Sequence, residues 1–190
     1  MFFITRDDEK KKRDKPMGKI WFKLMTWEFK NRDKKHPPLN KIKKTKIKMG
    51  DSVLDYGCGP GGYTIAAAEF VGKNGKVYAV DIHPLAIEKV KSRALERGLK
   101  NIDTILTDCD TQVIEGSVDS ILLLDILHDL SDSDKILKEL HRILKKEGWL
   151  AVEDHHLKDS EIIGEITHIK LFEFYEKNEE VFNFRRLNKI

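Results

Sequence analysis

Residues 53–62 read Val-Leu-Asp-Tyr-Gly-Cys-Gly-Pro-Gly-Gly, and this stretch decides how the rest of the chain is interpreted. The β-forming residues Val53, Leu54 and Tyr56 lead directly into a glycine-rich turn, and an alanine-rich run over 63–71 follows. We expect a strand, a tight turn and a helix in that order. Such a unit forms a cradle of the size of a nucleotide, because the helix N-terminus presents unpaired N–H groups to a ligand.

Asp55 sharpens this interpretation. The glycines at 57, 59 and 62 fit the pattern G-x-G-x-x-G, which is typical of many dinucleotide sites. A carboxylate two residues before the first glycine would repel a pyrophosphate on the loop, since like charges in a sheltered site cost free energy. It suits a ligand whose near end is cationic, as in S-adenosylmethionine (SAM).

The stretch resembles motif I of the class I SAM-dependent methyltransferases. The resemblance implies an α/β fold, a three-layer α/β/α sandwich with a seven-stranded, mostly parallel sheet, a C-terminal antiparallel hairpin and preceding N-terminal helices. It also implies SAM as cofactor and S-adenosylhomocysteine as product. The first cofactor-binding residues that it implies are Asp55, Gly57, Cys58, Gly59 and Gly61.

Length and composition favour one globular, soluble domain. The chain has 190 residues, of which 40% are hydrophobic and 35% charged. No run approaches the ~18 apolar residues of a membrane helix, and charges follow residues 1–4 at once, which argues against a signal peptide. The two cysteines show no metal-ligand spacing, so we expect a cytoplasmic protein without a metal.

Charge divides the chain into three segments. Residues 1–50 carry 17 Lys/Arg against 6 Asp/Glu, and residues 51–190 carry 18 against 26. We expect a basic, flexible arm over 1–15, a helical leader over 16–50 and the SAM-dependent methyltransferase domain over 51–190. The leader has apolar residues at helical spacing, Met17, Ile20, Trp21, Leu24 and Met25, up to the prolines at 37 and 38, and a short second helix follows them.

Three interpretations of this leader stay open. The base rate favours a helix that packs on the domain with its lysines in solvent. The resemblance favours a lid over the cofactor and acceptor pocket, as N-terminal helices form in that family. The lysines and tryptophans also fit a contact with nucleic acid or with an anionic membrane.

A second motif follows at residues 76–81, which predict a buried strand that ends in Asp81. Asp81 lies 24 positions after Gly57, near the place where an acidic residue binds ribose hydroxyls in a βαβ unit. The resembled family uses the acid at this strand end in that way, and we include the neighbouring Ile82 in the site. Asp81 could equally cap the helix predicted over 84–99, with Leu95 among its inward residues.

Asp108 and Cys109 follow a third predicted strand, 101–106. The resemblance implies that Asp108 accepts from the exocyclic amine of adenine and that the N–H of Cys109 meets a ring nitrogen. A nucleophilic role for Cys109 lacks a partner base.

The fourth predicted strand ends at Asp125, and its continuous apolar run indicates cover on both faces. Ligands bind at such carboxyl ends, so Asp125 should border the methionine end of SAM and His128 the acceptor. We select His128 as the catalytic residue, a general base; the alternative, for this and the other histidines, is a hydrogen-bonded residue of the pocket wall without a role in proton transfer. The Asn/Asp-Pro-Pro-aromatic motif of the DNA and protein-amide methyltransferases is absent here.

The remainder predicts a helix over 135–146 that Gly148 ends, a strand over 149–154, and a terminal hairpin around residues 176–179. His155 and His156 follow the strand. Both lie where an acceptor would bind. Adjacent residues on a strand point to opposite faces, so at most one of these histidines should serve in a metal site, and we expect no metal there.

The sequence thus predicts a SAM-dependent methyltransferase that acts on a small-molecule acceptor. One alternative is an RNA or protein methyltransferase that grips its substrate with the basic leader. Others are an NAD(P)-dependent oxidoreductase, which Asp55 disfavours, and a non-catalytic SAM-binding module. The acceptor and the oligomeric state stay open.

Overall fold

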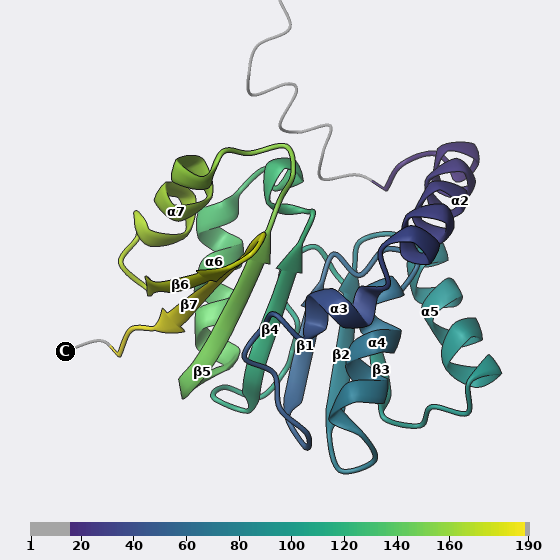
Figure 1. Ribbon diagram of the computed structural model, residues 1–190, viewed down its shortest axis with the longest axis horizontal. Helices are drawn as coiled ribbons and strands as arrows, with labels where there is room; N and C mark the ends of the chain where they lie inside the picture. Colours follow the sequence, from purple (N-terminus) through teal and green to yellow (C-terminus); the bar gives the residue numbers. More distant parts are fainter. Residues whose placement is uncertain (1–15, 189–190) are drawn as a thin grey trace, which may run out of the picture.

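Seven strands form one sheet in the order β3-β2-β1-β4-β5-β7-β6 (Figure 1). The computed structural model describes residues 16–188; the expected arm over 1–15 and residues 189–190 lie outside the described part. The strands are β1 Ser52–Tyr56, β2 Lys76–Asp81, β3 Ile102–Leu106, β4 Val118–Leu124, β5 Leu144–Glu153, β6 Phe172–Asn178 and β7 Val181–Arg186.

The direction of the strands follows from their connections. Strands β1 to β5 pair in parallel, with Leu54 of β1 between Tyr78 of β2 and Ile121 of β4. β7 pairs antiparallel with both β5 and β6, because a tight turn joins β6 to β7. The predicted fold, a mostly parallel sheet with a C-terminal antiparallel hairpin, is confirmed.

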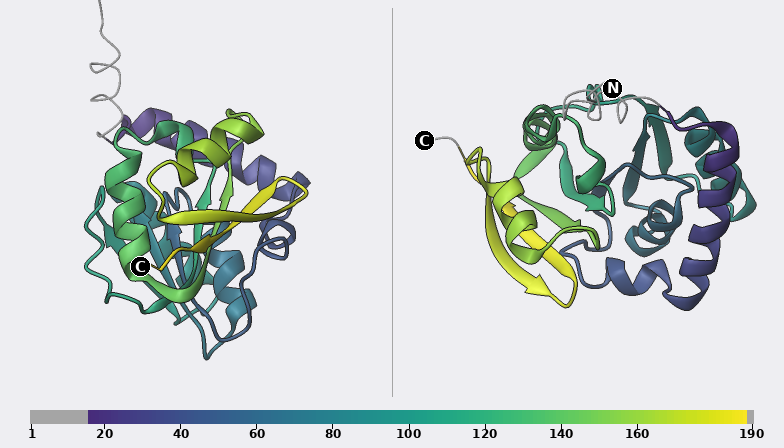
Figure 2. Two further views of the ribbon diagram at one scale, coloured as in Figure 1. Left: turned by 90° about the vertical axis from the view of Figure 1, so that its left-hand side faces the viewer. Right: turned by 90° about the horizontal axis from the view of Figure 1, so that it is seen from above.

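Helices cover both faces of the sheet, as the two views of Figure 2 show. One core cluster joins α6 and α7 to one face through residues such as Leu137 and Ile166, and another joins α3 and α4 to the opposite face through Ile42 and Ala67. The helices are α2 Lys19–Lys35, α3 Pro38–Ile42, α4 Gly62–Val71, α5 Pro84–Glu96, α6 Ser133–Ile143 and α7 Asp159–Thr167, with a 3-10 turn, η1, at Leu127–Asp129. None of the helices in residues 16–188 is long and apolar enough to cross a membrane.

The glycine stretch forms the expected strand, turn and helix. The N–H groups of Gly57 and Cys58 both donate to the carbonyl of Val80, at 2.9 and 3.0 Å, which ties the turn to the carboxyl end of β2. Gly57 has φ +73°, a left-handed conformation that glycine adopts without strain. The turn therefore lies at the edge of the sheet where the parallel strands end.

The boundary between α6 and β5 differs from the prediction. α6 ends at Ile143, and β5 begins at Leu144, which pairs with Val118 of β4. Gly148 does not end the helix; it lies within the strand, in a stretch where the register against β4 shifts. Pairing of Leu144 with β4 therefore outweighs the helix propensity of the lysines that follow it.

The inward faces of α2 and α5 were also assigned wrongly in part. In α2 the fully buried side chain is Phe22, whereas Ile20 and Trp21 of the expected apolar face are 83% and 69% exposed. In α5 Leu95 is exposed and Ala94 is buried instead. When two neighbouring stripes of a helix both contain apolar residues, their spacing does not predict which stripe is buried. Here contact with the rest of the fold determines which residues face inward.

Candidate active site

A cavity of about 700 Å³ lies at the carboxyl ends of β1, β2 and β4, and α2 forms one of its walls. Seven of the predicted site residues line it, and they come from four separate segments of the chain. They are Gly57, Gly59, Asp81, Ile82, Asp108, Asp125 and His128. The fold therefore brings together most of the residues that the sequence singled out.

The other four predicted residues, Asp55, Cys58, Gly61 and Cys109, do not line this cavity. Asp55 is 2% exposed and accepts a hydrogen bond of 2.6 Å from the Thr64 hydroxyl of α4. Its carboxylate therefore holds the start of α4 against β1. Because Asp55 does not line the cavity, it cannot repel a pyrophosphate there by direct contact, as the sequence had led us to expect. Cys58 and Cys109 are buried free thiols, and burial raises the pKa of both.

Burial raises the pKa of Asp55 to about 6, against an ordinary value of 3.8, and the Thr64 hydroxyl only partly offsets this. Between these two pH values the folded chain holds a proton that the unfolded chain has lost, so stability falls as pH rises through this window. The difference corresponds to about 3 kcal/mol. We therefore expect the unfolding free energy of Asp55→Asn, measured in urea, to rise by about 3 kcal/mol relative to that of the wild type between pH 4 and 7.

An exposed carboxylate serves as the control for this pH dependence. Asp103→Asn in β3 changes a residue with a 54% exposed side chain, so its unfolding free energy should run parallel to that of the wild type over the same pH range. A constant difference between Asp55→Asn and the wild type from pH 4 to 7 would contradict the assignment to Asp55.

Asp81 organises the cofactor end of the cavity. Its Oδ2 accepts from the N–H of Gly59 at 2.8 Å, and its Oδ1 accepts from the N–H of His83 at 2.7 Å. Burial raises its pKa above the ordinary range, while these two N–H groups act in the opposite direction. The helix cap belongs to His83, whose Nδ1 accepts from the N–H of Leu85. Asp81 thus fixes the glycine turn and keeps lone pairs on the cavity side.

Asp108 closes the same end. Tyr56, the last residue of β1, donates its hydroxyl to the carbonyl of Asp108, and both residues line the cavity. The Cys109 N–H points elsewhere, toward the Thr107 hydroxyl at 3.3 Å. The sequence indicates only that Tyr56 is a β-forming residue, so it does not predict that Tyr56 shapes the cavity.

Asp125 lies between a cation and an imidazole directly after β4. It has φ +60°, a conformation that aspartate tolerates better than most residues. Its Oδ2 is 3.8 Å from the guanidinium of Arg32 in α2, and its Oδ1 is 2.6 Å from Nδ1 of His155. That Oδ1 is buried and lacks an aligned hydrogen-bond donor among the described residues, so it can accept one from a bound ligand.

His128 is held by a buried carboxylate. Oδ2 of Asp154, whose side chain is fully buried, accepts from the backbone N–H of His128 at 2.9 Å and lies 2.8 Å from its Nδ1. Burial acts to raise the pKa of Asp154, but the hydrogen bonds from His128 and from the His156 N–H outweigh it and leave the pKa below its ordinary value. The ionised Asp154 favours a proton on Nδ1. The other ring nitrogen, Nε2, lies 3.4 Å from Oδ2 of Asp129, which also lines the cavity. A carboxylate that orients an imidazole in this way is compatible with the role of a general base.

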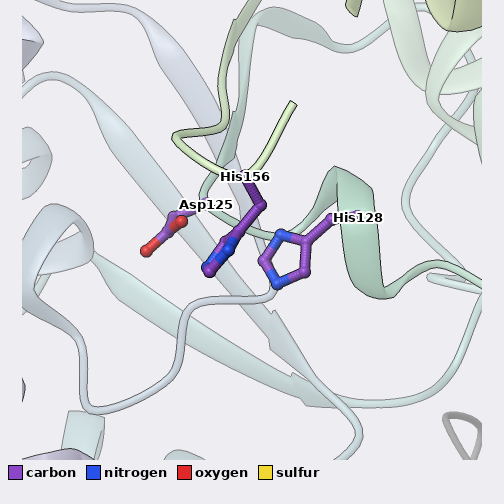
Figure 3. Close-up of side chains that lie close together, drawn as sticks. All are labelled: Asp125, His128 and His156. Carbon is purple, nitrogen blue, oxygen red and sulfur yellow. The ribbon is translucent and has the colours of Figure 1, made fainter. Parts of the chain in front are cut away.

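His155 and His156 both line the cavity, and of the two only His156 belongs to the group of described side chains that could hold a metal ion. They follow the end of β5 in a turn, where side chains no longer alternate between faces, and their ring centroids are 3.9 Å apart. The ring centroids of His156 and His128 are 4.1 Å apart, with the rings tilted by 48°. The carboxylate of Asp125 completes a group whose ligand atoms lie within 4.8 Å of one another (Figure 3).

This group has the residue types of a metal site, yet two of its members already have other partners. Asp154 orients His128, and Arg32 supplies a positive charge beside Asp125. We keep the prediction of a metal-independent protein. Pretreatment with EDTA should leave the turnover of labelled SAM unchanged within about twofold, and added Zn²⁺ should not raise it. A loss that Zn²⁺, Mn²⁺ or Ni²⁺ restores would contradict this prediction and assign the group as a metal centre.

The wall that α2 contributes could not be assigned residue by residue from the sequence. Phe22, Met25 and Phe29 line the cavity from α2, and the ring of Phe22 lies 4.4 Å from the ring of His83. Nε2 of His83 lies 2.9 Å from the carbonyl of Met17, which ties the start of the helix to the end of β2. The signal was present in the sequence as a second apolar stripe.

Comparisons with known proteins agree with this geometry. A family model described as a methyltransferase domain matches residues 47–183. The demethylmenaquinone methyltransferase of Lactobacillus johnsonii is 33% identical over 144 residues, which cover 72% of this chain and 57% of that protein. The aklanonic acid methyltransferase DauC of Streptomyces sp. strain C5 is 38% identical over 102 residues, 50% of this chain and 46% of that protein. The chain thus spans about half of the length of these relatives.

The fold is shared with a solved SAM-dependent methyltransferase from Aquifex aeolicus. The two chains are 24% identical with a TM-score of 0.71, and the match covers 96% of this chain and 98% of that one. The fold and the cofactor edge of the sheet define a nucleotide-binding α/β protein of the Rossmann-like type. The match to the methyltransferase domain narrows this class to one family. The chain belongs to the class I SAM-dependent methyltransferases, whose cofactor is SAM.

Proposed function

We propose that the protein transfers the methyl group of SAM to a small organic acceptor whose reacting atom first gives up a proton to His128. The observation that supports this most directly is the Asp154–His128 pair at the wall of the cavity, because methyl transfer itself needs few catalytic groups. An oriented base with a buried carboxylate behind it is more than cofactor binding requires. Its presence favours an enzyme over a non-catalytic binding module.

The cavity offers the donors and acceptors that the cofactor needs. We assign the ribose end to Asp81 and Ile82, and the adenine end to Asp108. The bare backbone of Gly57 and Gly59 leaves room along the turn. The largely buried carboxylate of Asp125, which lies between Arg32 and His155, suits the ammonium of the methionine moiety. Asp55 and Gly61 act through the turn and α4. The N–H of Cys58 donates to the carbonyl of Val80 and that of Cys109 to the Thr107 hydroxyl, so these two residues support the loops around the cofactor.

SAM supplies a methyl group on a sulfonium, which is already activated for displacement. The chain's own residues then have three tasks. The apolar side chains of α2 exclude water, Asp125 orients the polar end of the cofactor, and Nε2 of His128 takes the proton of the acceptor. Asp154 stabilises the imidazolium that results, since its carboxylate lies 2.8 Å from Nδ1.

The acceptor class follows from size and lining. A second hollow of about 600 Å³ adjoins the cavity, and Asp125 and His155 line both. Aromatic and aliphatic side chains dominate the α2 wall of the cavity, which suits a ring-bearing organic molecule. The printed names of the relatives, which include a demethylmenaquinone and an aklanonic acid methyltransferase, support the same class. A cytoplasmic location is proposed with it, from the two free cysteines.

Replacing Asp81 by alanine tests the cofactor assignment. Titration calorimetry with S-adenosylhomocysteine is expected to show a loss of about 1–3 kcal/mol in binding free energy, because buried hydroxyls of the ligand lose their acceptor. NAD should give no heat with either form. Asp103→Asn is the matched control, as it removes a carboxylate from the neighbouring strand outside the cavity.

The outcome separates the alternatives. Equal affinity of Asp81→Ala and wild type would remove Asp81 from the site, and binding of NAD in place of S-adenosylhomocysteine would reinstate the oxidoreductase. Once cofactor binding is established, a panel of phenols, quinols and secondary amines with methyl-labelled SAM identifies the acceptor. Tight cofactor binding without turnover on any member of the panel would favour a non-catalytic module.

A further inference from the structure

The outer side of α2 is an exposed apolar band. Ile20, Trp21, Leu24 and Trp27 are 83%, 69%, 47% and 62% exposed. In the right-hand view of Figure 2 this helix lies at the rim of the molecule. Large apolar side chains of this number on one helix mark a surface that meets another phase or molecule.

The two sides of α2 have separate tasks. Residues 20, 24 and 27 recur at helical spacing on one side, and residues 22, 25 and 29 recur on the other, which lines the cavity. The outer band is therefore not a misplaced part of the core. The inner stripe already satisfies the packing of the helix against the domain, and the outer tryptophans contribute nothing to it.

Lysines accompany the outer band. Lys19, Lys23 and Lys30 are exposed, and none of them takes part in the ion pairs found among residues 16–188. Residues 16–50 carry 11 Lys/Arg against 2 Asp/Glu, whereas residues 51–190 carry 18 against 26. Six of these 11 basic residues belong to α2, whose acidic residues are Glu28 and Asp33. Lys41, Lys44 and Lys46 lie after α2 and form ion pairs with Glu153, Glu180 and Glu176. The helix that carries the apolar band is therefore itself positively charged.

We propose that α2 lies on an anionic lipid surface, with Trp21 and Trp27 in the interfacial layer and the lysines against the headgroups. A helix with apolar and aromatic residues on one side and lysines beside them binds in this way. Tryptophan prefers the boundary between acyl chains and headgroups, because its ring is apolar and its N–H is polar. The acidic body of the chain is repelled by such a surface, which orients α2 toward it.

The charge argues against a second copy of the chain as the occupant. Two α2 helices packed through this band would bring their lysines together, and like charges at an interface disfavour it. An anionic bilayer meets the apolar band and the lysines at the same time. Because the same helix forms the wall of the cavity, this inference, which rests on the proposed function, assigns a lipid-soluble acceptor that enters from the bilayer.

Vesicle binding of the full-length protein tests the inference without any acceptor. The probes are vesicles of phosphatidylcholine alone and vesicles with about 30% phosphatidylglycerol added. The wild type should sediment with the anionic vesicles and remain in solution with the neutral ones, and its tryptophan emission should shift to the blue. Trp21→Ser/Trp27→Ser should lower the partition coefficient at least about tenfold. Lys19→Glu/Lys23→Glu should lower it at least as much, by reversing two charges.

Matched substitutions elsewhere on the surface provide the controls. Leu95→Ser removes an 83% exposed leucine from α5, and Lys91→Glu/Lys100→Glu reverses two exposed lysines away from α2. Both variants should bind vesicles as the wild type does. Trp21→Phe/Trp27→Phe keeps the band apolar, so it should retain vesicle binding and lose the blue shift.

Three results would overturn the inference. One is equal binding, or no binding, to neutral and anionic vesicles. Another is a concentration-dependent dimer in light scattering that Trp21→Ser/Trp27→Ser abolishes. The third is RNA binding that the lysine variant loses and the tryptophan variant keeps. Calorimetry with S-adenosylhomocysteine on the same variants should match the wild type, so failure of vesicle binding is distinguishable from failure of the proposed function.

Discussion

His128→Ala is expected to lower kcat by about 10²–10⁴-fold, the range over which a positioned general base contributes to proton transfer. The loss follows from removal of Nε2, while the cofactor end of the cavity around Asp81 is unchanged. The affinity for S-adenosylhomocysteine should therefore stay within about twofold of the wild type. Turnover is measured with the acceptor that gives the fastest transfer of label from SAM.

Two further variants test whether the effect belongs to a base. His155→Ala removes an imidazole that also lines the cavity, and it should cost less than about tenfold, because its side chain is 61% exposed and its carboxylate partner, Asp125, also faces Arg32. Asp154→Asn should reproduce part of the His128→Ala loss, because the ring loses its orienting acceptor. It should also displace the acid limb of the pH–rate profile. An unchanged kcat in His128→Ala would assign the histidine to the pocket wall alone.

Gly57→Ala is expected to destabilise the fold by about 2–5 kcal/mol. At φ +73° a residue with a Cβ pays about 1–2 kcal/mol for the left-handed backbone. The added Cβ would also lie 2.6 Å from Cγ1 of Ile126, and overpacking of this kind costs about 1–3 kcal/mol more. Urea unfolding at constant pH measures the difference, and cofactor affinity should fall together with stability, because the turn borders the cavity.

The two contributions can be separated. Gly116 has φ +62°, and a Cβ added there would meet nothing within 4 Å, so Gly116→Ala should show the backbone cost alone. In the double variant Gly57→Ala/Ile126→Ala the steric contact is relieved, so it should recover part of the loss relative to Ile126→Ala. If Gly57→Ala and Gly116→Ala cost the same, Ile126 does not crowd the turn.

The sequence predicted the sheet because its strands are long apolar runs that end in polar residues. Val118–Leu124 is one example: burial on both faces leaves a continuous pattern that does not depend on distant contacts. Asp81 and Asp125 were placed correctly at the carboxyl edge for the same reason. Their position is set by the strand that precedes them, and strand ends of a parallel sheet meet at one edge.

The features that escaped prediction depend on contacts between distant segments. Nothing in the neighbourhood of His128 indicates that Asp154 lies behind it, since 26 residues separate them. Asp55 is buried because the turn brings α4, with Thr64, against the end of β1. In α2 two apolar stripes compete, and only contact with His83 and the glycine turn selects Phe22. Two interpretations of the leader remain compatible with the structure, a helix packed on the domain and a lid, because α2 packs on the domain and lines the cavity.

The position of α2 in the chain also sets the order in which the cavity can form during synthesis. α2 leaves the ribosome before any strand of the sheet, yet its buried side chain Phe22 contacts His83, which follows β2, and its Arg32 approaches Asp125, which follows β4. The helix therefore has no docking surface until the chain has been made at least to that point. During synthesis α2 therefore exposes both of its apolar stripes until the chain has reached Asp125, so the nascent chain presents apolar surface that the folded domain covers in part.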